Sequence, residues 1–224
     1  MLTMTDNFKL IKEFIQLQWD GQFDSFTDAF YTVEIISRSK DNTNTKSHKF
    51  KAYYITNMSD FDKYENEIKL LCDALQARAY VSVNAKSWHK ITLNTMAEYA
   101  NRIAQDNFDK PYSVFDSCAA KYVERVNQLW IVDVDKEDAD KYNLSVDDLV
   151  DNYINVIESC KPKKKIITVI PTKTGKHIIT HPFNTAEFIM ELMNLTSCNK
   201  TDKITSIDDI IKKNNNTLLY ENIK

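Results

Sequence analysis

Residues 129–135 read LWIVDVD and form the clearest buried-strand signal in the 224-residue chain. The run of apolar and β-branched residues is typical of a strand with both faces covered. Alternation along a strand places Asp133 and Asp135 on one face and Val134 on the other. Carboxylates so placed repel unless a cation or water separates them, and such oxygen pairs suit Mg²⁺ or Mn²⁺. The alternative to a metal site is a strand that simply ends at the surface in the charged residues of the segment 133–138.

Strands and helices are predicted on both sides of this segment. The β-branched and aromatic runs predict strands at 30–36, 49–55, 77–83, 165–171, 176–183, 207–211 and 217–220. Helical periodicity predicts helices at 7–18, 60–76, 88–105, 113–127, 145–160 and 184–195. A ββαβαα half is thus followed by a βαββαββ half, which favours an α+β fold over a doubly wound parallel fold.

Capping residues are expected at three helix starts. Ser59 is predicted to cap the helix at 60–76, whose inner face would carry Leu70, Leu71 and Leu75. Ser113 is predicted to cap the helix at 113–127. Ser145 is predicted to cap the helix at 145–160, with Asp148 at the third helical position.

The composition excludes several classes of protein. The chain has only two glycines, Gly21 and Gly175, far apart, so neither a Walker phosphate loop nor a Rossmann fingerprint can form. A net charge of −3 is unusual for a protein that grips duplex DNA mainly by charge. The four cysteines lack CxxC spacing, which makes a structural zinc site improbable and indicates reduced core residues. We see neither a signal peptide nor an apolar run near 20 residues, so a cytoplasmic protein with no membrane partner is expected.

The turn at 172–177 (TKTGKH) gathers groups that could hold an anion. It combines two hydroxyls, two lysines, a glycine and a histidine between two predicted strands. Gly175 can adopt positive φ, which would let backbone N–H groups point together toward a phosphate. His177 would begin the next strand at the same end of the sheet. For the loop alone, a tight hairpin with a solvated tip is the more frequent explanation.

Two further polar clusters are open to both structural and functional explanations. Asp208 and Asp209 precede a short strand, where an acidic helix start or loop is the usual interpretation. Residues 77–94 (ARAYVSVNAKSWHKITLN) place basic and aromatic side chains around a strand-to-helix turn, as in proteins that hold single strands by phosphate contact and base stacking. A strand whose aromatic residues enter the core explains this segment equally simply and is favoured. The candidates for nucleic-acid contact there are Arg78, Lys86 and Trp88.

Taken together, residues 129–221 resemble the catalytic half of the archaeo-eukaryotic primase superfamily, which includes the primase-polymerases. That family's pattern is a strand ending in Asp-x-Asp, a Ser/Thr-Gly-x-Gly-x-His-like hairpin, and then an acidic residue near a later strand. Here these are Asp133 and Asp135, the hairpin with His177, and Asp209. The segment DDIIKKNNNTLLY also resembles the run that closes many such cores. Thr172 replaces the family's serine, and Lys176 stands where a second glycine often lies.

The resemblance implies a fold and a set of roles. The fold would be a primase-polymerase-like core, in which an N-terminal mixed αβ unit (1–127) packs on a C-terminal RRM-like βαββαβ unit (128–224) as one compact globule. Two ions, Mg²⁺ or Mn²⁺, would be held by Asp133, Asp135 and Asp209, with Asp202, Asp208 and Glu221 as alternatives for the third acid. The incoming nucleotide's phosphates would be contacted by His177, with Thr172, Lys173 and Lys176 nearby.

Three functions follow as hypotheses. The first is a primase-polymerase-like nucleotidyltransferase that takes nucleoside triphosphates, uses a single-stranded template and works beside replication proteins. The second is a catalytically inactive accessory or counter-defence protein of a phage, acting in the bacterial host cytoplasm, which keeps the fold and binds nucleotide or nucleic acid. The third is a metal-dependent nuclease, which is less favoured because the Lys/His hairpin suits a triphosphate better than a water nucleophile.

Overall fold

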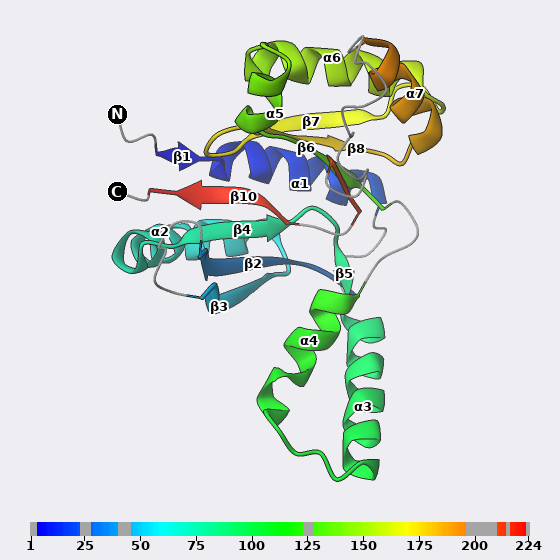
Figure 1. Cartoon of the computed structure of the whole chain (residues 1–224). Coiled ribbons are helices and arrows are strands. Elements are labelled where there is room, and N and C mark those ends of the chain that lie inside the picture. Colours follow the sequence, from blue (N-terminus) through cyan, green and yellow to red (C-terminus); the bar gives the residue numbers. More distant parts are fainter. Residues whose placement is uncertain are drawn as a thin grey trace.

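The computed structural model describes residues 4–22, 28–39, 46–122, 128–195, 210–213 and 216–222. The fold is mixed α+β and contains two antiparallel sheets, as the order of predicted elements indicates (Figure 1). No helix within these ranges is both long and apolar enough to cross a membrane. The cysteines among them, Cys72, Cys118 and Cys160, are free thiols.

The first sheet is built mainly from the N-terminal half. Its main strand order is β1-β10-β4-β2-β3, and β5 pairs with one end of β2. The strands are β1 (Thr5–Asp6), β2 (Ala29–Ser37), β3 (His48–Ile55), β4 (Arg78–Ser82), β5 (Lys86–Ser87) and β10 (Asn216–Glu221). Because β10 lies between β1 and β4, the last strand of the chain completes the sheet of the first half.

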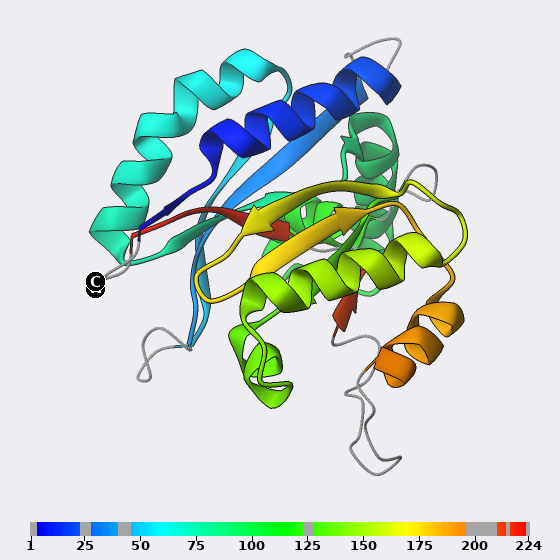
Figure 2. The same ribbon diagram turned by 90° about the horizontal axis from the view of Figure 1, so that it is seen from above.

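Two helices cover one face of the first sheet. Helix α1 (Phe8–Gln22) and helix α2 (Met58–Leu75) lie side by side over it, as the view from above shows (Figure 2). Helix α1 also touches the second sheet, so one hydrophobic core joins side chains of α1, α2 and both sheets. Because α1 packs against both sheets, side chains from both sheets lie in the same hydrophobic core.

The start and inner face of α2 differ from the sequence prediction. Asn57 caps the helix, accepting from the backbone N–H of Asp60, whereas Ser59 lies inside the first turn. The buried residues are Phe61, Ile68 and Cys72, spaced by seven and four. The predicted inner face is therefore wrong: Leu70 and Leu75 are exposed and Leu71 is only partly buried, because they do not lie on the stripe through positions 61, 68 and 72.

The second sheet contains the segment 129–135. Its strands are β6 (Trp130–Val134), β7 (Ile166–Pro171), β8 (Lys176–Thr180) and β9 (Ile211–Lys212), in the order β7-β8-β6-β9. All three pairings are antiparallel. Helices α5 (Lys136–Lys141), α6 (Val146–Ser159) and α7 (Thr185–Leu195) supply its connections, and side chains of all three join one core with this sheet (Figure 1). The predicted cap of α6 is confirmed, because Ser145 and Asp148 form a reciprocal capping box.

Two asparagine side chains connect the two sheets. Asn7 donates from its side chain to the Pro171 carbonyl of β7 at 2.8 Å and to the Leu218 carbonyl of β10 at 2.9 Å. Asn84, after β4, accepts from the Leu129 N–H at 2.7 Å and donates to the Leu129 carbonyl at 2.9 Å. Each amide thus satisfies two backbone groups, in effect extending the strand hydrogen bonding across the junction.

Two helices project from this body as an arm. Helix α3 (Trp88–Ala104) runs outward and helix α4 (Val114–Lys121) returns after a 3₁₀ turn at Pro111–Ser113 (Figure 1). Ser113 occupies the N-cap position of α4 but makes no capping hydrogen bond with its side chain. The remainder of the predicted 113–127 helix, residues 123–127, lies outside the described residues.

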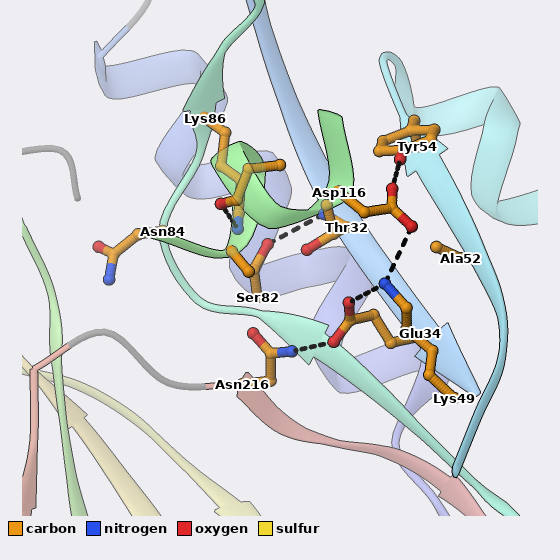
Figure 3. Close-up of a pocket in the computed structure, with 12 residues that line it drawn as sticks. Thr32, Glu34, Lys49, Ala52, Tyr54, Ser82, Asn84, Lys86, Asp116 and Asn216 are labelled. Carbon is orange, nitrogen blue, oxygen red and sulfur yellow. Dashed lines mark hydrogen bonds and ion pairs between the residues drawn. The ribbon is translucent and has the colours of Figure 1, made fainter. Parts of the chain in front are cut away.

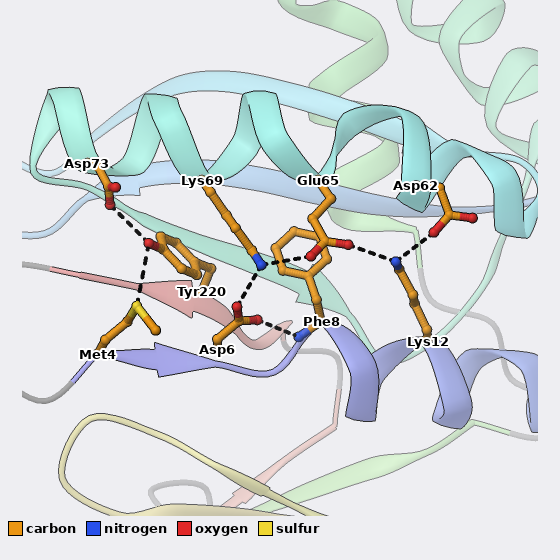
Figure 4. A network of polar contacts seen from close by, with 9 residues as sticks. All are labelled: Met4, Asp6, Phe8, Lys12, Asp62, Glu65, Lys69, Asp73 and Tyr220. Atoms are coloured by element: carbon orange, nitrogen blue, oxygen red, sulfur yellow. Dashed lines mark hydrogen bonds and ion pairs between the residues drawn. The ribbon is translucent and has the colours of Figure 1, made fainter.

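A chain of ion pairs holds the N-terminus against α2 (Figure 4). Glu65 accepts from Lys12 at 2.8 Å and from Lys69 at 2.7 Å, and Lys69 also pairs with Asp6 at 2.6 Å. Partial burial alone would raise the pKa of Glu65, but the hydrogen bonds from the two lysines outweigh it and hold that pKa below its ordinary value.

Replacing Glu65 by Gln should therefore lower stability in a pH-dependent way. A depressed carboxyl pKa stabilises the fold fully above the unfolded value of about 4.3, and this contribution disappears as pH falls through the folded value. We expect Glu65→Gln to lower the free energy of unfolding by about 1 kcal/mol at neutral pH, with the difference vanishing in acid. Urea denaturation of both proteins across this pH range measures it. A difference that does not shrink in acid would contradict the role of the Glu65 charge.

Candidate functional site

The candidate site lies where β6 and β8 pair. Their register places Asp133 directly opposite His177, although the two residues are 44 positions apart in sequence. The His177 Nε2 lies 3.3 Å from the Asp133 Oδ1. The fold therefore brings together two predicted site residues that came from separate motifs.

Alternation decides which way these two side chains face. On β6 and β8, Ile131 and Ile179 belong to the core shared with α1, while Val132 and Ile178 belong to the core under α6. Asp133 and His177 alternate with the second set. Both therefore face the junction with the first sheet and away from α6.

The imidazole of His177 bridges the two sheets. Its Nδ1 lies 2.9 Å from the Thr217 Oγ1 on β10, and its Nε2 faces Asp133. A neutral ring satisfies both contacts if Nε2–H donates to the carboxylate and Nδ1 accepts from the Thr217 hydroxyl. Thr217 is completely buried, so its hydroxyl orients the ring and is not an accessible nucleophile. Sequence reasoning missed Thr217, because a buried threonine in a strand carries no distinguishing pattern.

Gly175 is required by close packing and not by its φ angle. The residue does not have positive φ. A Cβ built on Gly175 would overlap the Val134 carbonyl oxygen and lie 3.0 Å from the Asp135 Cα. Its N–H donates to the Thr172 Oγ1 at 3.1 Å inside the turn. The expectation that positive φ at Gly175 would form an anion-binding nest is therefore wrong, because backbone contact accounts for the glycine.

The remaining hairpin residues point in different directions. Thr172 is used within the turn, where its N–H also donates to the Gly175 carbonyl at 2.9 Å. Lys173 pairs with Glu221 of β10 at 3.3 Å, and Lys176 pairs with Asp147 at the start of α6 at 2.5 Å. Lys176 therefore lies toward the helix layer, on the opposite side of β8 from His177.

The predicted metal ligands are described only in part. Asp133 is the penultimate residue of β6, and Asp135 occupies the N-cap position of α5 without a capping hydrogen bond from its side chain. Asp209, Asp208 and Asp202 lie outside the described residues. Glu221, the remaining alternative, is buried between Arg78 and Lys173. Among the described residues, no group of three or more acidic, histidine or cysteine side chains is close enough to hold a metal ion.

The three residues predicted to contact nucleic acid have structural partners. The Arg78 Nε lies 3.1 Å from the Glu221 carboxylate, and both residues are buried. Lys86 is only 9% exposed and donates to the Ala119 carbonyl at 2.6 Å. Trp88 packs against Phe30, with ring centroids 3.9 Å apart. These positions favour the structural explanation of the segment, and its nucleic-acid role stays a prediction.

A polar cavity of about 120 Å³ lies on the other face of the first sheet, beside α4 (Figure 3). Its carboxylates are engaged by protein donors: Glu34 accepts from Lys49 and Asn216, and Asp116 accepts from Lys49 and Tyr54. Lys86 reaches into the same cavity and bonds to a neutral carbonyl. Burial lowers the pKa of Lys86, partly offset by the charge of Glu34.

Gly175→Ala should destabilise the protein strongly. The new methyl group would collide with backbone atoms at the end of β6, which cannot rotate away as a flexible side chain can. We expect a loss of about 3 kcal/mol in the free energy of unfolding, measured by chemical denaturation. Thr174→Ala, in the exposed tip of the same turn, is the matched control and should change stability little. Equal stability of the two variants would show that the hairpin does not pack as described.

Lys86→Met should raise stability at neutral pH. The folded state holds the Lys86 proton less tightly than the unfolded chain, so wild-type stability rises as pH increases toward the ordinary lysine pKa of about 10.4. We expect Lys86→Met to gain about 1 kcal/mol at neutral pH, a gain that shrinks in alkali. Lys49→Met, which removes the cation shared by the Glu34 and Asp116 carboxylates, should instead lose stability. Denaturation curves recorded at neutral pH and in alkali distinguish these outcomes.

Comparison with known proteins assigns no relative. No protein-family profile, no curated protein and no solved structure matches the chain. The function therefore has to be argued from the site and the topology of the sheets.

Proposed function

We propose that the chain is a primase-polymerase-like nucleotidyltransferase, which adds a nucleotide from NTP or dNTP to a primer or an initiating nucleotide on a single-stranded template. The observation that carries the proposal is the register that pairs Asp133 with His177. The resemblance assigns metal binding to the first residue and phosphate contact to the second. These two roles require Asp133 and His177 to lie at the same place.

The topology of the second sheet supports the same proposal. Its elements run β6, α5 and α6, β7, β8, α7 and β9, and its strand order is β7-β8-β6-β9 with antiparallel pairing. This is the split βαβ arrangement of ferredoxin-like units, to which the RRM-like fold belongs. The N-terminal αβ unit then corresponds to the first sheet with α1 and α2, completed by β10.

The residues present could perform the expected chemistry. The carboxylate donors of Asp133, Asp135 and Asp209 suit Mg²⁺ or Mn²⁺. Two such ions, when bound, stabilise the attacking and leaving oxygens of an in-line displacement. His177 is oriented by Thr217, so a substrate phosphate replacing Asp133 as its partner would meet a ring already in place. Orientation before binding reduces the entropy lost when the substrate binds.

One set of contacts favours the second candidate, a nucleotide-binding protein without catalysis. Lys173 is held by the buried Glu221, and Lys176 lies across β8 from His177. Neither lysine therefore faces His177 in this structure. A protein that binds nucleotide without transferring it does not need these cations at a reacting phosphate.

The polymerase proposal predicts loss of activity in two variants that stay folded. Asp133→Asn and His177→Ala should each reduce Mn²⁺-dependent primer extension at least about 100-fold, because each removes a group that acts at the transferred phosphate. Asp151→Asn, an exposed acid on α6, is the control and should keep wild-type activity. Thermal unfolding should show all three variants folded. Unchanged extension by Asp133→Asn protein would overturn the proposal.

Nucleotide binding without metal distinguishes the second candidate. A thermal shift by NTP or dNTP that persists in EDTA, together with no extension in Mn²⁺, would favour binding without catalysis. A shift that requires Mn²⁺ and disappears in Asp133→Asn would favour the nucleotidyltransferase. Both readouts use the full-length chain.

A further inference from the structure

The arm formed by α3 and α4 exposes an unusual amount of apolar side chain. On α3, Leu93, Met96 and Ile103 are 53%, 64% and 63% exposed, and Ala100 is exposed between them. The arm projects away from both sheets (Figure 1), so the body of the protein does not cover this face. Exposed apolar stripes of this kind mark surfaces that associate with another protein.

The exposed residues form a regular stripe. Positions 93, 96, 100 and 103 are separated by three, four and three residues, which is the a–d spacing of a two-stranded helical seam. The helix is already used on its other side, where Ile91 and Thr95 are buried and Trp88 stacks on Phe115 of α4. The stripe is therefore a second apolar face of α3, on the side of the helix that does not pack against the rest of the protein.

The residues beside the stripe indicate what kind of helix could pack on it. The flanking e and g positions within the helix are Thr92, Ala97, Tyr99 and Ala104, none of which is charged. Two copies of α3 can therefore approach without repulsion between like charges along most of the seam. Small residues at 97, 100 and 104 allow close contact between the helix backbones. Nucleic acid is a poor occupant, since the stripe carries no cation.

We propose that α3 pairs with α3 of a second copy of this chain, in antiparallel orientation, to form a symmetric dimer. In this orientation Leu93 of one copy packs on Ile103 of its partner, and Met96 packs on Ala100. The antiparallel direction places the two bodies at opposite ends of the seam, because each arm extends away from its own sheets (Figure 1). This assembly is independent of the nucleotide chemistry proposed above.

A dilution series measured by light scattering after gel filtration tests the dimer. The wild-type chain should change from twice its 26.1 kDa mass to the monomer on dilution. Leu93→Glu combined with Ile103→Glu should be monomeric at every concentration, with unchanged circular dichroism. Leu70→Glu, on the exposed face of α2, is the control for an added surface charge and should dimerise like wild type.

A charge-pairing variant tests both the partner and the direction. Leu93→Lys combined with Ile103→Glu places opposite charges on each other only in an antiparallel pair, so this variant should dimerise and the dimer should weaken with salt. In a parallel pair the same substitutions oppose like charges and should give a monomer. A wild-type monomer at all concentrations, or a dimer unaffected by the double glutamate variant, would overturn the proposal. Dimerisation of wild type with a monomeric charge-pairing variant would overturn its antiparallel geometry.

Discussion

The close packing of Gly175 on the end of β6 sets the geometry around the candidate site. The turn of the β7–β8 hairpin lies against the Val134 carbonyl and the Asp135 backbone so closely that a Cβ cannot fit. Because the turn is held there, β8 pairs with β6 in the one register that places His177 opposite Asp133. A one-residue slip would turn His177 toward α6 and bring Ile178 to the junction, burying an imidazole among aliphatic side chains. Packing at this glycine thus helps to hold the register that keeps His177 at the junction and Ile178 under α6.

The same hairpin is also fixed from the side of the first sheet. Asn7 binds the Pro171 carbonyl, Lys173 pairs with Glu221, and Thr217 contacts His177. Two of these partners lie on β10, so the last strand of the chain completes the first sheet and positions the hairpin of the second. Polar groups buried at such a junction are stable only when each has a partner. This requirement accounts for the asparagine, the threonine and the acid that line it.

Much of the fold follows from the sequence because strand and helix periodicity are local. LWIVDVD, the capping box at Ser145 and the α+β order depend on neighbouring residues and are confirmed. Predictions that depend on a partner far away in the sequence are less often correct. An arginine at position 78 could bind a phosphate or an acidic side chain, and the local sequence does not distinguish the two. The pairing of β4 with β10 does, because it brings Arg78 to Glu221, 143 positions away. The turn composition indicates a backbone requirement at Gly175, but that requirement is contact with another strand.

Charge explains why the candidate site and the arm can be separate features. The lysines of the hairpin are engaged by acids of β10 and α6, so the electrostatics of the site depend on elements that pack around it. The stripe on α3 contains no charged residue and is isolated from those elements by the length of the arm (Figure 1). Association through the stripe would therefore leave the Asp133–His177 pair unchanged. A dimer built in this way would hold two identical sites at a fixed separation, on bodies that remain free to bind independently.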